Sequence, residues 1–145
     1  MTLHASCAVA QYRCEPLAQA HRRLLQQFYR IHGSAMRPSG EAQLWVARKP
    51  QIIAGLSLAP VADGHWLTGL FVDPAHRGRG IARALVDAAQ AHGQGPTWLF
   101  CAPDLQRFYE GMGFAAACAL PEALNNRLQR YQRSKTLVAL HRPGL

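Results

Sequence analysis

The strongest constraint on what this chain can fold into is the stretch from Leu67 to Ala84, which reads LTGLFVDPAHRGRGIARA. Its first part, Leu67 to Val72, is apolar and predicts a buried strand. Asp73-Pro74 ends that strand, because proline lacks the N–H that a ladder needs. Arginines and glycines then alternate, and a helix-forming run begins at Ile81. Because the first N–H groups of a helix have no intrahelical partner and carry partial positive charge, the loop is predicted to bind a phosphate or pyrophosphate.

Two familiar phosphate loops do not fit this stretch. A Walker loop ends in Gly-Lys-Ser/Thr, and here Gly80 is followed by Ile81. A dinucleotide fingerprint has glycine at the last position of G-x-G-x-x-G, and here that position is Arg83. Neither motif is present. The alternative that the residues themselves leave open is a surface turn with two solvated arginines.

A third pattern does fit. Val72-x-Pro74-x-x-Arg77-x-x-Gly80-x-Ala82 resembles the Arg/Gln-x-x-Gly-x-Gly/Ala motif of the GNAT superfamily of N-acetyltransferases, in which this loop binds the pyrophosphate of acetyl-CoA. The resemblance implies acetyl-CoA as co-substrate, with its pantetheine arm paired to the end of the central strand, and no metal. The residues that it implies in binding are Leu70, Phe71, Val72, Arg77, Gly78, Arg79, Gly80, Ile81 and Ala82.

A second motif lies between Cys101 and Phe114, which reads CAPDLQRFYEGMGF. It resembles the superfamily's second signature, a helix that carries tyrosine and ends in Gly-Phe, and is most similar to the arylalkylamine-type members. The match implies Tyr109 as the general acid and Phe108 as a further cofactor contact. A phenol suits this role, because its pKa of about 10 is close to the value of about 8.5 for the departing thiol. The alternative is that Tyr109 belongs to an apolar core stripe.

The acceptor amine must lose a proton, and the sequence offers no clear base. His65, at the start of the central strand, is the nearest titratable candidate. A lone histidine at a strand edge is more often solvated, so an amine that arrives neutral, or a chain of water molecules, stays an alternative.

Composition favours one compact domain over residues 1–145, since 49% of the residues are hydrophobic and no stretch is low in complexity. No apolar run is long enough to cross a bilayer, and the N-terminus lacks the pattern of a signal peptide. The four cysteines form no C-x-x-C pair and no zinc pattern, which favours reduced thiols and a cytoplasmic protein. We therefore expect no metal and no membrane partner.

The formal net charge of +8 makes nucleic-acid binding an alternative to be weighed. The arginines are spread along the chain, however, and no DNA- or RNA-binding motif is present. A basic surface also suits an enzyme whose co-substrate carries several negative charges, because the field concentrates that ligand. We therefore expect no nucleic-acid partner.

The order of predicted elements is typical of an α/β fold with a mixed sheet. A strand over 7–12 and a helix opened by Glu15-Pro16 precede a three-stranded meander and a helix to about His92. Short strands and helices alternate from there to the C-terminus. The remaining elements are predicted as strands over 44–48, 51–58, 65–72, 97–101, 114–118 and 136–141, with helices from Pro103 and Pro121.

Together these observations predict an acetyl-CoA-dependent N-acetyltransferase of the acyl-CoA N-acyltransferase fold. Its acceptor is a primary amine on a small molecule or a protein. Two rival hypotheses are a non-catalytic acyl-CoA-binding module of the same fold and a basic nucleic-acid-binding domain. Dimers are common in the superfamily, so the resemblance also allows a homodimer.

Overall fold

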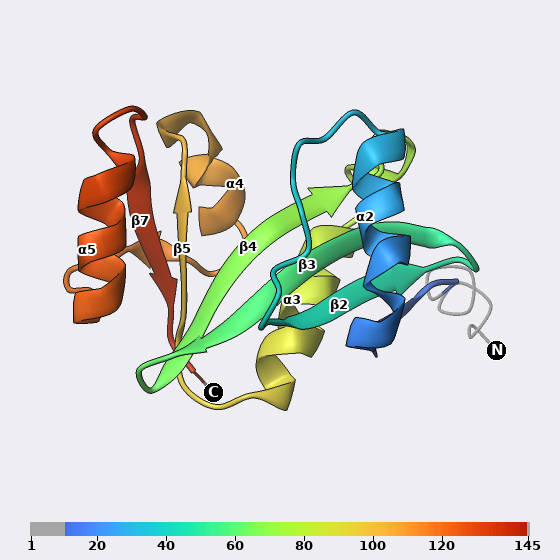
Figure 1. The fold of residues 1–145 in the computed structure, drawn as a ribbon, viewed down its shortest axis with the longest axis horizontal. Helices are drawn as coiled ribbons and strands as arrows, with labels where there is room; N and C mark the ends of the chain where they lie inside the picture. The colour runs from blue at the N-terminus through green and yellow to red at the C-terminus, as the bar shows by residue number, and fades with distance from the viewer. Residues whose placement is uncertain (1–10, 145) are drawn as a thin grey trace, which may run out of the picture. The chain divides into compact units, whose positions relative to one another are not determined.

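The computed structural model describes residues 11–144, which contain one mixed sheet with strand order β1-β2-β3-β4-β5-β7-β6 (Figure 1). The pairing of β4 with β5 is parallel, and the pairings β1–β2, β2–β3, β5–β7 and β6–β7 are antiparallel. This sheet with its helices confirms the predicted fold class. The chain divides into two compact units, Met1–Leu58 with Thr68–Ala89, and Ala59–Leu67 with Gln90–Leu145. That residues 1–145 form a single domain stays a prediction.

The first unit holds the N-terminal strands, the helices that cover them, and the loop that follows the central strand β4. Strands β3 and β4 and helix α3 each have residues in both units. The bounds are β1 Arg13–Leu17, η1 Gln19–His21, α2 Arg22–Ile31, β2 Gln43–Arg48, β3 Ile52–Val61, β4 Gly64–Val72, η2 Pro74–His76 and α3 Ile81–His92.

Helices α2 and α3 lie on opposite faces of strands β2 and β3 (Figure 1). Leu25, Phe28 and Tyr29 of α2 pack with Leu44 and Val46 of β2 in one buried cluster. The helix comes close to the sheet at Gly55 of β3, where any Cβ would collide with Leu25. The buried residues of α3 recur at helical spacing, as its amphipathic pattern predicts: Ile81, Ala82, Leu85, Val86, Ala89 and Gln90.

The second unit contains the parallel pairing of β4 with β5, in which His65 lies opposite Thr97. The predicted β4–α3–β5 crossover with parallel strands is therefore confirmed. Trp66, Trp98 and Leu124 form its buried cluster, so α5 covers this part of the sheet. The remaining bounds are β5 Thr97–Cys101, η3 Pro103–Leu105, α4 Gln106–Glu110, β6 Ala115–Ala116, α5 Glu122–Tyr131 and β7 Val138–Arg142.

Two predicted elements need correction, and a third falls largely outside the described residues. The strand predicted over 7–12 falls largely outside the described residues, and β1 begins only at Arg13. Glu15 and Pro16 lie within β1 and do not open a helix, because β1 is an edge strand and proline is tolerated there. The strand predicted over 114–118 is only the pair Ala115–Ala116.

Candidate active site

The glycine loop after β4 has the backbone geometry of an anion site. Gly78 and Gly80 have φ angles of +77° and +76°, and a Cβ at either position would meet no atom within 4 Å. The first turn of α3 closes with a hydrogen bond of 3.0 Å from the N–H of Ala84 to the carbonyl of Gly80. The N–H groups of Ile81 and Ala82 precede this bond and so have no intrahelical partner. The loop thus offers helix-terminal donors beside open space, which is what an anion needs.

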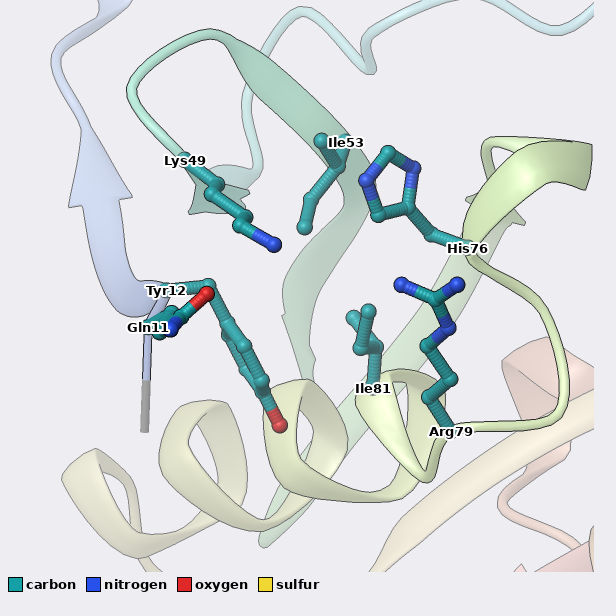
Figure 2. Close-up of a pocket in the computed structure, with 7 residues that line it drawn as sticks. All are labelled: Gln11, Tyr12, Lys49, Ile53, His76, Arg79 and Ile81. Atoms are coloured by element: carbon teal, nitrogen blue, oxygen red, sulfur yellow. The ribbon is translucent and has the colours of Figure 1, made fainter. Parts of the chain in front are cut away.

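The two arginines of the loop point in different directions. Arg77 turns back onto β4, where its Nε donates a hydrogen bond of 3.0 Å to the carbonyl of Val72. Its guanidinium carbon lies 5.1 Å from the ring centroid of Phe71, a cation–π contact. Arg79 instead reaches into a hollow beside the start of α3 (Figure 2). Both arginines remain predicted contacts of the pyrophosphate, although their side chains have different neighbours in this structure.

The central strand is distorted just before the predicted cofactor residues. Gly69 has φ +70° within β4, a left-handed conformation that glycine adopts at β-bulges. The hydroxyl of Tyr29 on α2 donates a hydrogen bond of 2.6 Å to the carbonyl of Gly69. A Cβ at this glycine would lie 2.8 Å from the same hydroxyl oxygen. Burial raises the pKa of Tyr29, so its hydroxyl keeps the proton that it donates. Sequence reasoning missed Tyr29, and a glycine inside an apolar strand was the only signal.

Leu70, Phe71 and Val72 are half-buried at the end of β4. Phe71 packs edge-on against Phe28 of α2 with ring centroids 5.9 Å apart, and the ring of His32 lies 6.0 Å away. The side chain of Phe71 therefore contacts α2, so only its backbone is free to pair with an extended ligand.

A carboxylate with two histidines follows β4, and the sequence analysis did not single it out. Oδ2 of Asp73 lies 3.3 Å from Nδ1 of His76 and 3.9 Å from Nε2 of His32. Its other oxygen accepts a hydrogen bond of 2.9 Å from the N–H of Ala75. That backbone bond, with smaller contributions from the two histidines, lowers the pKa of Asp73. The capped turn fixes the backbone where the loop begins.

The second predicted site residue, Tyr109, lies on α4 in the second unit. Its ring packs edge-on between Phe108 and Phe114, with centroid distances of 5.1 and 5.8 Å. Burial, with a smaller contribution from Cys101, raises the pKa of Tyr109 to about 12. The phenol therefore stays protonated throughout the physiological range and is available as a donor. Phe108 is 49% exposed, so its face is open to a ligand.

The structure does not bring His65 together with Tyr109. His65 lies opposite Thr97, the first residue of β5, and its ring packs against Gly93. Tyr109 follows the last residue of β5, and the strand between them is about 13 Å long at 3.3 Å per residue. Burial lowers the pKa of His65. The sequence could not place His65, because the register between β4 and β5 is not visible in it.

Within residues 11–144, no group of three or more His, Cys, Asp or Glu side chains is arranged to hold a metal ion. None of the helices in this part of the chain has both the length and the apolar character required to span a membrane.

This protein has the acyl-CoA N-acyltransferase fold, in which a glycine loop joins the central strand of a mixed sheet to a helix. A family model described as an acetyltransferase (GNAT) domain matches residues 40–116, more than half of the chain, including the glycine loop and Tyr109. The chain therefore belongs to the GNAT acetyltransferase family. No curated protein matches it by sequence.

Solved structures of this family are similar in fold along nearly the whole chain. Ard1 from Thermoplasma volcanium has a TM-score of 0.66 at 14% identity, covering 94% of this chain and 99% of its own. Nourseothricin acetyltransferase has a TM-score of 0.63 at 15% identity, covering 94% and 100%. N-acetylglutamate synthase from Neisseria gonorrhoeae, solved with coenzyme A and N-acetyl-glutamate, has a TM-score of 0.62 at 16% identity, covering 91% and 35%. At these identities the likeness establishes the fold alone.

Proposed function

We propose that this protein transfers an acetyl group from acetyl-CoA to a primary amine. The observation that carries the proposal is the loop, in which Gly78 and Gly80 hold positive φ angles beside the start of α3. That geometry presents backbone N–H groups to an anion without side chains in the way. The family supports acetyl-CoA as the ligand, and the coenzyme A complex of N-acetylglutamate synthase is one instance within this fold.

In the proposed reaction the pyrophosphate binds the N–H groups from Gly78 to Ala82. The pantetheine arm pairs with the backbone of Leu70 to Val72, and an N–H of this strand polarises the thioester carbonyl. The nitrogen of the acceptor attacks that carbonyl carbon directly, so that a C–N bond forms and the C–S bond breaks. Most of the acceleration then comes from holding the two reactants in line.

Tyr109 is proposed to give its proton to the departing thiolate. Its raised pKa of about 12 supports a donor that is always protonated, although proton transfer to sulfur is then less favourable than for an unperturbed phenol. We propose that the acceptor reacts as the neutral amine and loses its proton to water, because His65 lies at the far end of β5 from Tyr109. The acceptor itself is proposed only as a class, a small-molecule amine or an amine of a protein.

The first test is a thermal-shift titration with acetyl-CoA, with ATP and NAD at matched concentrations as controls. Ligand at about 100 times its dissociation constant adds roughly 2.7 kcal/mol of stability. For a chain of this length that raises Tm by roughly 5 to 10 °C. A selective rise supports the loop assignment. An equal rise with ATP, or none, would contradict it.

The second test measures thiol release from acetyl-CoA with a panel of amines. The panel contains a small arylalkylamine, a peptide with a free N-terminus, and an N-blocked peptide with one lysine. Release above the rate of hydrolysis with any of them supports the enzyme. A thermal shift with acetyl-CoA but no release across a broad amine panel would instead support the non-catalytic acyl-CoA-binding module.

A further inference from the structure

We infer that the hollow beside the start of α3 binds a second ligand, a compact carboxylate or phosphate ester with a short apolar body. The hollow has a volume of about 280 Å³ and lies wholly within the first unit. Figure 2 shows the side chains of Lys49 and Arg79 directed into it, with His76 beside them. The inference goes beyond the proposed function, because that function uses the backbone N–H groups of the glycine loop, whereas the hollow is lined by the side chains of Lys49, Arg79 and His76.

The charge of the lining specifies an anion. Lys49 and Arg79 come from the turn between β2 and β3 and from the glycine loop, and no carboxylate lines the hollow. Within residues 11–144 no ion pair joins either side chain to a carboxylate. Two positive charges that face one hollow repel each other. An anion between them removes that repulsion and accepts charge-assisted hydrogen bonds from both.

His76 adds a third nitrogen to the hollow. Its Nδ1 is directed to Asp73, at 3.3 Å from Oδ2, which fixes the orientation of the ring. Figure 2 shows the other ring nitrogen on the side of the hollow. The ring is therefore positioned by a carboxylate on one side and offers Nε2 to a ligand on the other.

The floor of the hollow is apolar. Ile53 and Ile81 are 5% and 3% exposed, and the ring of Tyr12 forms one wall. A β-bulge places Ile53 there, since Arg48 pairs with Ile52 and Ala47 with Ala54, which leaves Ile53 as the additional residue. A hollow with cations at its rim and isoleucines at its floor suits an anionic head joined to a short hydrocarbon or ring. Its volume is at the low end for ligand pockets, which favours a compact ligand over a nucleotide.

The experiment titrates the full chain at low salt with phenyl phosphate, benzoate and phenol, followed by calorimetry and by NMR shifts of backbone amides. Both anions are expected to bind and to shift the amides of Lys49 and Ile53, whereas phenol binds at least tenfold more weakly. Lys49→Gln is expected to weaken phenyl phosphate binding about tenfold, the usual loss for one charge-assisted hydrogen bond. Arg79→Gln is expected to weaken phenyl phosphate binding to a similar extent, but Lys49→Gln is the variant for comparing acetyl-CoA affinities, because Arg79 lies in the glycine loop.

The chain offers a matched control, because its only other lysine, Lys135, is exposed and lies in the second unit. Lys135→Gln is expected to bind phenyl phosphate like the unaltered protein. Equal binding of phenol and the anions, no binding of either anion, or equal affinities in the two lysine variants would overturn the inference.

Competition with acetyl-CoA separates this site from the proposed active site. Phenyl phosphate is expected to bind in the presence of saturating acetyl-CoA, and Lys49→Gln is expected to leave the affinity for acetyl-CoA unchanged. Displacement of phenyl phosphate by acetyl-CoA, together with weaker acetyl-CoA binding in Lys49→Gln, would overturn the inference by showing that the hollow belongs to the acetyl-CoA site. Failure of acetyl-CoA to bind at all would contradict the proposed function and leave the anion titration intact.

Discussion

The glycine loop of the first unit and the tyrosine helix of the second obtain their chemistry in different ways. The loop is exposed, and its Gly78 and Gly80 act through backbone conformation, with no atom within 4 Å of a Cβ at either position. Tyr109 is proposed to act through its side chain, whose ring packs against Phe108 and Phe114 and whose pKa burial raises to about 12. The loop offers open space with backbone donors, and the tyrosine helix offers a partly buried phenol that stays protonated.

This difference shows which changes separate binding from chemistry. A change of backbone freedom in the loop is expected to change the affinity for acetyl-CoA, because the loop N–H groups are the proposed contacts of its pyrophosphate. Removal of one oxygen in the tyrosine helix acts on proton transfer, because the ring that carries it still packs. Tyr109→Phe and Gly80→Ala each change one of these regions and leave the other intact.

Tyr109→Phe is expected to have the largest effect. General acid catalysis contributes at least about 100-fold, so kcat for thiol release should fall by about that factor. The dissociation constant for acetyl-CoA should not change, because the phenyl ring still packs against Phe108 and Phe114. Single-turnover kinetics and calorimetry measure the two quantities separately.

Tyr131→Phe is the matched control for this prediction, because it removes a hydroxyl from a tyrosine that is 44% exposed on α5. It should leave kcat unchanged. Equal kcat values for Tyr109→Phe and Tyr131→Phe would show that the thiolate leaves without a proton from Tyr109. The pKa of about 12 also predicts that kcat shows no alkaline decline from this group below about pH 11.

Gly80→Ala is expected to weaken binding and leave catalysis nearly unchanged, the reverse of Tyr109→Phe. An L-residue at φ +76° is strained by about 1 to 2 kcal/mol, and its methyl group enters the space left for the ligand. The dissociation constant for acetyl-CoA should therefore rise about tenfold, whereas kcat at saturation should change little. Gly40→Ala is the control, since Gly40 has no positive φ and its nearest neighbour is 4.0 Å away. A loss of kcat with unchanged affinity in Gly80→Ala would contradict the loop as the anion site.

Local patterns predicted much of the fold. The apolar run Thr97–Cys101 is β5 with the predicted bounds, and the buried residues of α3 are those of its 3.6-residue pattern. The prediction that a helix begins at Glu15-Pro16 was wrong, because both residues lie in β1, an edge strand that accepts proline. Whether a strand is at an edge depends on the whole sheet, which the sequence does not display.

The candidate site follows the same division. The glycine loop was predicted because glycine and the helix start are neighbours in sequence. The hydrogen bond from Tyr29 to Gly69 was not, because the two residues are 40 positions apart. The divergence of Arg77 and Arg79 also escaped the sequence, since it depends on Phe71 and on a hollow formed by three separate segments. Residue roles that rest on distant contacts need the structure.

Tyr29→Phe tests such a distant contact. It removes the hydrogen bond to the carbonyl of Gly69, and the unfolding free energy should fall by about 1 kcal/mol. Because that bond holds the distortion of β4 beside Leu70, kcat/KM should fall as well, while Tyr131→Phe changes neither. Urea unfolding at pH 7.5 measures the change in stability. Unchanged stability together with unchanged kcat/KM would show that β4 keeps its shape without α2.

The smallest expected effect is the pH dependence that His65 gives to stability. Burial lowers its folded-state pKa below the ordinary value of 6.5, so the folded protein binds this proton less readily than the unfolded chain. The contribution is therefore fully present above about pH 6.5 and is lost as the pH falls through the folded-state pKa. Urea unfolding between pH 8 and pH 5 should show a decline that His65→Phe reduces. Asp73 acts in the same direction only below its own ordinary pKa of 3.8, outside this range.

His21→Gln is the control for that prediction, because His21 is exposed at the end of η1 and belongs to the first unit. It should keep the full decline between pH 8 and pH 5. If His65→Phe keeps it too, the imidazole is as well solvated when folded as when unfolded, and its packing against Gly93 does not disfavour its charge. A decline that disappears only in His65→Phe would instead support burial of the neutral ring. Such burial argues against His65 as the base, because a base that takes a proton during turnover must accept charge readily near neutral pH. The same measurement therefore separates the packing role of His65 from the catalytic role that its place in the sequence first indicated.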